Sequence, residues 1–175
     1  MVNILEVCIC MENKILVTYA TRTGSTVDVA VEIGREMRKL GSTVDIIPMD
    51  EVRDITGYDA VVIGSPIRVG KWLPEAVRFV KKHSDDLRRV HTALFTVCMT
   101  LFEDTPENRD LVNSYIEPLY EYVKPVAVGA FAGAVKPDNM NVLERFVMRM
   151  VKAPVGDFRD WEAIHTWATD VYWLM

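Results

Sequence analysis

Hydroxyl side chains and a glycine gather in one short loop whose residue types suit a phosphate group. The loop reads Thr21-Arg22-Thr23-Gly24-Ser25-Thr26, after an apolar run and before a helical pattern. Backbone N–H groups at a helix N-terminus are unpaired and carry partial positive charge, so they hold an anion without a dedicated lysine. The hydroxyls add donors, and Gly24 lets the backbone curl around the oxygens. The loop therefore predicts a phosphate site, with an ordinary helix N-cap as the alternative.

The same loop excludes two common nucleotide sites and resembles a third. It matches neither G-x-x-x-x-G-K-[ST] nor G-x-G-x-x-G, the motifs of nucleoside triphosphate and dinucleotide sites. It resembles the FMN phosphate loop of flavodoxin-like proteins. That resemblance implies FMN as the cofactor.

A second segment, after the strand expected over 60–63, favours the same cofactor. It reads Gly64-Ser65-Pro66-Ile67-Arg68-Val69-Gly70-Lys71-Trp72. It is similar to the G-[ST]-P-x-R-x-G stretch of flavodoxin-like quinone reductases, whose backbone meets the polar edge of the isoalloxazine ring. We expect Pro66 to fix a turn and Gly70 to tolerate a strained backbone. Trp72 or Ile67 is expected to cover a ring face.

A third predicted cofactor segment ends the strand expected over 92–97. Its residues are Val97, Cys98, Met99 and Thr100. We expect Cys98 to be a small buried residue near the ring rather than a redox partner. Arg68, and after it Lys71, is expected to stabilise the anionic reduced flavin, with a purely solubilising role as the alternative. Because a flavin performs the electron transfer itself, no catalytic triad is expected.

The histidines receive no chemical role. We expect His83 to be a solvated helix end, His91 a surface cap before a strand, and His165 an exposed residue of the last helix. No two of them have the spacing of metal ligands, so no metal is expected.

The composition predicts one compact domain. The 175 residues carry a net charge of −5 and are half apolar, which allows a sizeable core and argues against a nucleic-acid partner. No apolar run reaches the roughly 18 residues of a membrane span. Three cysteines fit a reducing compartment, so a cytoplasmic location is expected. Cys8 and Cys10 lie in a leader over 1–12, interpreted as an extension, an extra edge strand or a start-site artefact, not as a signal peptide.

Short apolar runs alternate with longer amphipathic ones, which is typical of a doubly wound α/β fold. We expect strands over 14–20, 43–48, 60–63, 92–97 and 125–131. We expect helices over 25–40, 73–87, 106–122 and 161–173, and a short helical turn over 50–55. The buried stripe predicted for the first helix comprises Val27, Ala30, Val31, Gly34 and Met37. The pattern predicts a flavodoxin-like domain over 13–175 with a five-stranded parallel sheet, order 2-1-3-4-5, and helices on both faces.

An insertion over about 133–159 separates the last strand from the last helix. We expect a helix over 141–152, with Arg145 and Arg149 on its polar side. The insertion is basic on an otherwise acidic protein. One interpretation is an ordinary packed helix; the other is a lid or docking surface for anionic groups or a membrane surface.

The chain resembles the flavodoxin-type protoporphyrinogen oxidases, also called menaquinone-dependent protoporphyrinogen dehydrogenases, from Lys14 to about Val171. The shared stretches are Tyr19 to Gly24, Val61 to Gly64, Ile67 to Gly70, Phe79 to His83, Gly129 to Ala134, Glu144 to Met148 and Asp160 to Glu162. The resemblance implies FMN, dehydrogenation of a porphyrinogen in heme biosynthesis, and transfer of the electrons to a quinone. Since that family carries a basic insertion at the same place, it also implies a substrate role for Arg145 and Arg149.

Two other functions remain open. One is a flavodoxin-type electron carrier that docks with redox proteins, and the other is an NAD(P)H–quinone reductase. The basic insertion favours the enzyme, whereas acidic residues after the fourth strand favour the carrier. The expected partner is a porphyrinogen or quinone, or else a redox protein, and not a nucleic acid. Contact with the inner face of the membrane and a homodimer are further alternatives.

Overall fold

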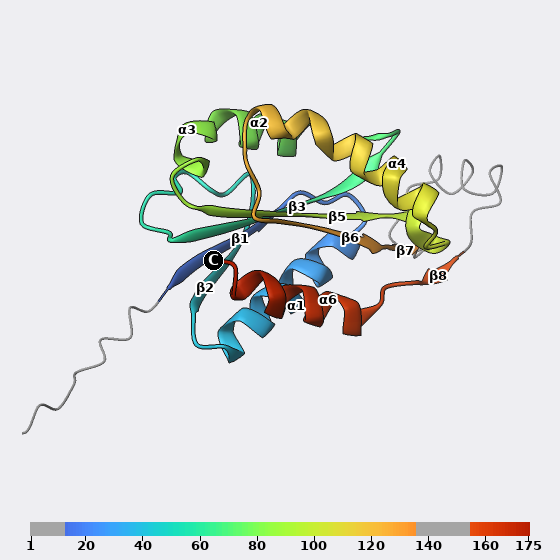
Figure 1. Cartoon of the computed structure of the whole chain (residues 1–175), viewed down its shortest axis with the longest axis horizontal. Coiled ribbons are helices and arrows are strands. Elements are labelled where there is room, and N and C mark those ends of the chain that lie inside the picture. The colour runs from blue at the N-terminus through green and yellow to red at the C-terminus, as the bar shows by residue number, and fades with distance from the viewer. Residues whose placement is uncertain (1–12, 136–154) are drawn as a thin grey trace, which may run out of the picture.

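The computed structural model describes residues 13–135 and 155–175 (Figure 1). Its centre is a sheet in the order β2-β1-β3-β5-β6, in which these strands run parallel and β4 pairs antiparallel with β3. The strands are β1 Lys14–Tyr19, β2 Thr43–Pro48, β3 Ala60–Arg68, β4 Lys71–Trp72, β5 His91–Cys98 and β6 Ala127–Ala132. The five parallel strands follow the predicted order 2-1-3-4-5, so the predicted fold class is confirmed.

Helices cover both faces of this sheet. They are α1 Ser25–Lys39, α2 Pro74–Lys82, α3 Ser84–Leu87, α4 Pro106–Ile116 and α6 Trp161–Tyr172, with 3-10 turns η1 Met99–Phe102 and η2 Glu117–Glu121. Figure 1 shows α1 and α6 on one face and α2, α3 and α4 on the other. The winding reverses between β1 and β3, so the carboxyl ends of these strands form the crevice where doubly wound folds bind ligands. None of the helices in the described ranges combines the length and apolarity that crossing a bilayer requires.

Two apolar layers, one on each face, explain the continuously apolar strands. Leu16 of β1 packs in the layer beneath α2 and α4, whereas its neighbours Ile15 and Val17 pack in the layer beneath α1 and α6. Successive strand residues point to opposite faces, and here both faces are covered. A strand in this position gains burial from every residue.

Gly64 of β3 is required by close packing. A Cβ at Gly64 would lie 1.9 Å from the ring of Phe95, its neighbour on β5. Phe95 is fully buried and makes an edge contact with Trp167 of α6, with ring centroids 6.3 Å apart. The glycine therefore makes room for an aromatic ring that fills the layer beneath α6.

The buried stripe of α1 differs from the prediction. Val27 is only partly buried and Val31 faces solvent, while Val29 and Ile33 are fully buried instead. The other predicted positions are confirmed. The prediction was wrong at the two valines because the sequence fits two offset helical stripes, and contact with the sheet selects one of them.

Three other predicted helical segments differ from the structure. The segment 50–55 is a turn and irregular chain, not a helical turn. The helix expected over 73–87 is divided at His83 into α2 and α3. The helix expected over 106–122 changes to a 3-10 turn at Glu117, because Pro118 lacks the N–H that would continue it.

A small hairpin closes the base of the insertion. The strands β7 Ala134–Val135 and β8 Gly156–Asp157 pair antiparallel. The helix expected over 141–152, with Arg145 and Arg149, lies outside the described residues, as does the leader with Cys8 and Cys10.

Candidate functional site

The loop between β1 and α1 is open to an anion. Gly24 is the N-cap of α1 and has φ 92°, a left-handed conformation that favours glycine. As a glycine, Gly24 has no side chain with which to cap the first turn of α1. By contrast, Thr105 caps α4 and Asp160 caps α6. The N-terminal end of α1 therefore suits an acceptor such as a phosphate.

The predicted loop hydroxyls have different surroundings. Thr21 Oγ1 accepts a hydrogen bond from the Gly24 N–H at 3.2 Å and so holds the turn. Thr26 is 1% exposed, and its Oγ1 has no hydrogen-bond partner among the described residues. A buried hydroxyl without a partner costs about 1–3 kcal/mol. Thr23 and Ser25 are half-buried in the same loop. The residues present therefore fit a phosphate group, which would supply the acceptor that Thr26 lacks.

Arg22 ties this loop to the start of α2. Its guanidinium binds the Glu75 carboxylate through two contacts, and the distance from Nη2 to Oε2 is 3.0 Å. Burial raises the pKa of the Glu75 carboxyl, but the hydrogen bond from Arg22, a backbone hydrogen bond and the charges of Arg22 and Arg78 together outweigh burial, so the net pKa lies below its ordinary value. The Arg22 side chain thus joins the phosphate loop to the first turn of α2, and its predicted contact with the cofactor stays a prediction.

The second predicted segment forms a hairpin. β3 continues beyond its predicted end to Arg68, and the chain returns as β4. Val69 and Gly70 form the turn with φ values of 51° and 69°, as a two-residue type I′ turn requires. A β-branched residue rarely adopts this conformation, and Val69 is fully exposed. The strained position is therefore Val69 together with Gly70, whereas the sequence predicted strain at Gly70 alone.

Two predicted residues at the base of the hairpin are structural. Ser65 is fully buried, its Oγ accepts the Leu73 N–H at 3.2 Å, and its carbonyl accepts the Thr96 hydroxyl at 2.9 Å. Pro66 lies inside β3 opposite Val97 of β5. The predicted turn at Pro66 is therefore wrong, since the chain turns where positive φ is adopted and not at the proline.

The hairpin brings the predicted ring contacts together. Arg68 pairs with Lys71, and both side chains are exposed. Ile67, which is half-buried, pairs with Trp72. Trp72 is 3% exposed in the layer beneath α2 and α4, and its indole N–H has no acceptor among the described residues. Trp72 packs as a core residue, so its contact with a flavin ring stays a prediction.

The end of β5 is buried, and η1 continues from it. Val97 and Cys98 are both buried. Burial raises the pKa of the Cys98 thiol, which stays protonated near neutral pH, as expected for a small apolar residue. Met99 and Thr100 are half-buried at the start of η1. The structure therefore places this segment at the same sheet edge as the first two.

No pattern in the sequence predicts one further set of contacts, which is made by the segment between β8 and α6. The side chain of Arg159 is 4% exposed and binds Asp28 at 2.7 Å and Asp157 at 2.5 Å. Phe158 contacts Phe102 of η1 with ring centroids 4.6 Å apart. Asp28 lies in the first turn of α1, where a free carboxylate would repel a phosphate. Arg159 offsets that charge and links the phosphate loop to η1.

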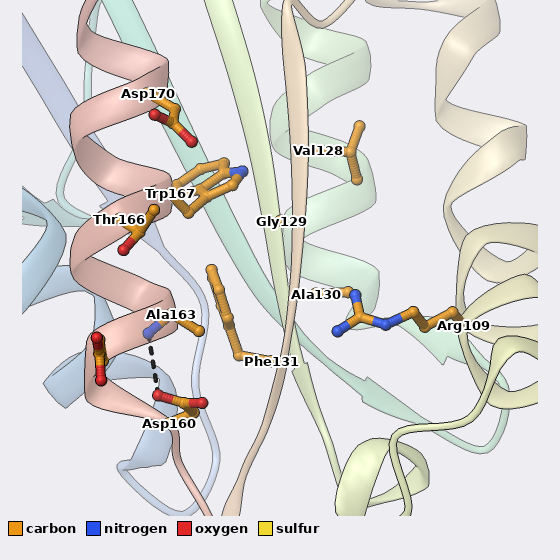
Figure 2. Close-up of a pocket in the computed structure, with 11 residues that line it drawn as sticks. Arg109, Val128, Gly129, Ala130, Phe131, Asp160, Ala163, Thr166, Trp167 and Asp170 are labelled. Carbon is orange, nitrogen blue, oxygen red and sulfur yellow. Dashed lines mark hydrogen bonds between the residues drawn. The ribbon is translucent and has the colours of Figure 1, made fainter.

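Two hollows among the described residues have no residue of the phosphate loop in their walls. One, of about 490 Å³, follows the edge strand β6; Figure 2 shows Arg109 on one side of β6 and Phe131 and Trp167 on the other. The second, of about 570 Å³, lies between the hairpin and α4 and includes Lys71 and Trp72. The loops remain the better cofactor site, because a phosphate is held by backbone N–H groups at a helix end and needs no closed cavity.

The structure corrects the prediction for His83. Its side chain is 6% exposed and its ring lies 4.7 Å from that of Phe79. Burial lowers the pKa of the imidazole. The neighbouring lysines suggested a solvated helix end, but the position follows the buried Phe79 and Val80 at helical spacing.

The other histidines lie at the surface. His91 is exposed, with Nδ1 2.5 Å from the carbonyl of Met175, and His165 is half-buried 3.3 Å from Glu32. Within 13–135 and 155–175, no group of metal-ligating side chains comes together.

Comparison with known proteins identifies the fold family. A family model of the flavodoxin domain matches residues 16–161, from β1 to the start of α6. The chain belongs to the flavodoxin domain family. The match includes the three loops described above, so the resemblance inferred from their residues is confirmed.

Curated relatives span nearly the whole chain. Protoporphyrinogen IX dehydrogenase (quinone) of Escherichia coli strain K12 is 27% identical over 172 residues, which cover 90% of this chain and 94% of that protein. The protein of the same name from Leishmania major is 24% identical and covers 90% of this chain and 74% of its own length.

Solved structures share the fold at lower identity. Oxidised flavodoxin 1 from Bacillus cereus has a TM-score of 0.59 and 16% identity, covering 91% of this chain and 97% of that one. A Lactobacillus acidophilus flavoprotein in complex with FMN has a TM-score of 0.51 and 15% identity, covering 68% of this chain and 93% of that one.

Proposed function

We propose that this flavodoxin domain protein is an FMN-dependent oxidoreductase that dehydrogenates a porphyrinogen and passes the electrons to a quinone. One observation carries the proposal: the relative named for this reaction in Escherichia coli aligns with 90% of the chain at 27% identity. The flavodoxin domain match, residues 16–161, includes the phosphate loop and the hairpin, which supply the residue types that FMN requires. A small molecule or a redox protein is accordingly the class of partner.

The phosphate of FMN would lie at the N-terminus of α1. The left-handed N-cap Gly24 and the unpartnered hydroxyl of Thr26 support this position. Thr21, Thr23 and Ser25 complete the loop. Arg159 keeps the Asp28 carboxylate paired, so the field at the helix end stays positive.

The isoalloxazine ring would lie between the hairpin and the start of η1. Bound FMN supplies the electron transfer, and the protein's residues bind it, orient it and exclude water. Backbone groups of Ser65 to Gly70 are the proposed partners of the polar ring edge. The exposed cations Arg68 and Lys71 would favour a negatively charged reduced ring.

One of the exposed acids beside η1 is paired, so the acidic charge that favours a carrier is smaller than the sequence suggests. A carrier needs exposed acids around the flavin edge, and Glu103, Asp104 and Glu107 are exposed there. Asp104, however, is bound by Arg109 at 2.5 Å, which offsets part of that acidic charge. Arg145 and Arg149 of the insertion are proposed to hold the propionates of a porphyrinogen.

The test is anaerobic oxidation of protoporphyrinogen by the FMN-loaded protein with a quinone acceptor. The proposal predicts turnover, which falls when Arg145→Glu and Arg149→Glu are combined while FMN binding is unchanged. Absence of turnover, together with a long-lived one-electron reduced flavin during stepwise reduction, would establish the carrier instead. Turnover that survives the charge reversal would keep the enzyme and remove these arginines from the substrate site.

A further inference from the structure

A groove on the face opposite α1 lies next to the proposed flavin hairpin. It is bounded by the end of the hairpin, by α2, and by α4 with η2, and its volume is about 570 Å³. This volume lies within the range of sites that hold a drug-sized organic molecule. The groove and the hairpin share Gly70, Lys71 and Trp72. A molecule in the groove would therefore touch the segment proposed to contact the flavin ring.

The walls of the groove suit a flat apolar ring. Trp72 comes from β4, Tyr115 from α4 and Tyr122 from the end of η2. Val77 of α2 and Leu119 of η2 add aliphatic surface between them. Aromatic walls of this kind stack on flat rings by offset or edge contacts, each worth about 0.5–1.5 kcal/mol beyond burial.

The charge at the rim of the groove favours acceptor oxygens on that ring. The exposed lysines Lys71 and Lys81 line the rim, against a single lining carboxylate, Glu121. The Lys81 ammonium makes a cation–π contact with Tyr122, 4.7 Å from the centre of its ring, and this contact holds the lysine at the rim. The rim is therefore net positive.

We infer that this groove is a second ligand site, which takes a flat apolar ring carrying carbonyl or anionic oxygens, such as a quinone. The choice of a quinone rests on the proposed function and deepens it, since it places the electron acceptor on the α2–α4 side of the hairpin. The site itself rests on the groove and its donors. Its ligand can accordingly be tested without turnover.

The first experiment fills the groove. Ser114 lines it and is exposed on α4, whereas the adjacent Asn113, which is also exposed, is not among its lining residues. Binding of menadione, an uncharged naphthoquinone, is measured by calorimetry for the full chain with and without FMN. Ser114→Trp is expected to weaken binding at least about tenfold because the indole occupies the groove. Asn113→Trp should bind as the parent does.

The second experiment tests the cations. Lys81 lines the groove and the exposed Lys82 does not, so Lys81→Gln and Lys82→Gln change the net charge equally. Naphthoquinone sulfonate should bind about threefold to fivefold more weakly to Lys81→Gln, a size expected for an exposed charge contact. Lys82→Gln should leave its affinity unchanged. Menadione, which has no charge, should respond to neither variant.

Equal binding of menadione to Ser114→Trp and Asn113→Trp would overturn the inference. Equal binding of the sulfonate to the two lysine variants would overturn the role of the rim. The proposed function can fail separately from this inference. If the protein does not bind FMN but Ser114→Trp weakens menadione binding, the groove site stands and the proposed flavin function fails. If the protein binds FMN but does not bind menadione, the flavin function stands and the groove site fails.

Discussion

Replacing Val69 by asparagine should stabilise the protein. Val69 has φ 51° in the hairpin turn, where a left-handed backbone costs a residue with a Cβ about 1–2 kcal/mol. Asparagine tolerates this conformation, and Asn-Gly is the preferred pair in a type I′ turn. The Val69 side chain is fully exposed, so no packing is lost. We expect a gain of about 1 kcal/mol in the free energy of unfolding, or about 2–4 °C in melting temperature for a protein of this size.

The assay is urea denaturation of the FMN-free protein. A higher midpoint concentration of urea with an unchanged m-value shows a gain in stability. Val31→Asn is the matched control, because Val31 is also exposed but has ordinary helical backbone in α1. That variant should gain nothing, since valine and asparagine have similar helix propensities. If Val69→Asn is no more stable than the parent, the turn is not strained and the reasoning fails. If it is more stable but binds FMN more weakly, the strain serves the cofactor.

Three further predictions concern the core and the loops. Gly64→Ala should destabilise the protein by about 1–3 kcal/mol, because its Cβ would meet Phe95 at 1.9 Å, and Phe95→Leu should restore part of the loss in thermal melts. The pKa of His83, measured by NMR, should lie below its ordinary value of 6.5. The unfolded state then binds the proton more readily than the folded state, so the free energy of unfolding should be constant above pH 6.5 and fall below it. A pKa above 6.5 would contradict the buried placement. Thr23→Asp should weaken FMN binding about tenfold or more, because a carboxylate would face the phosphate; an unchanged FMN titration would remove the loop from the site.

The elements that the sequence predicted well depend on local signals. Strands covered on both faces are apolar at every position, and hydroxyls with a glycine mark the start of α1, so the sheet order and the start of α1 could be inferred. The hairpin could not, because β3 continues to Arg68 only where β5 and β4 provide partners for its backbone. The bond between Arg159 and Asp28 joins residues 131 positions apart, a separation at which no periodic pattern gives information.

The short pair of strands β7 and β8 makes the insertion after β6 a part of the chain that can be exchanged. Ala134 pairs with Asp157 and Val135 with Gly156, so the two ends meet whatever lies between them. Closing a longer loop costs little, about 0.6 kcal/mol for each doubling of its length. Evolution or a protein engineer can therefore lengthen, shorten or exchange this insertion while the loops after β1, β3 and β5 stay at the same edge of the sheet. Chimaeras joined at β7 and β8 would place the insertion of one protein on the cofactor-binding domain of another.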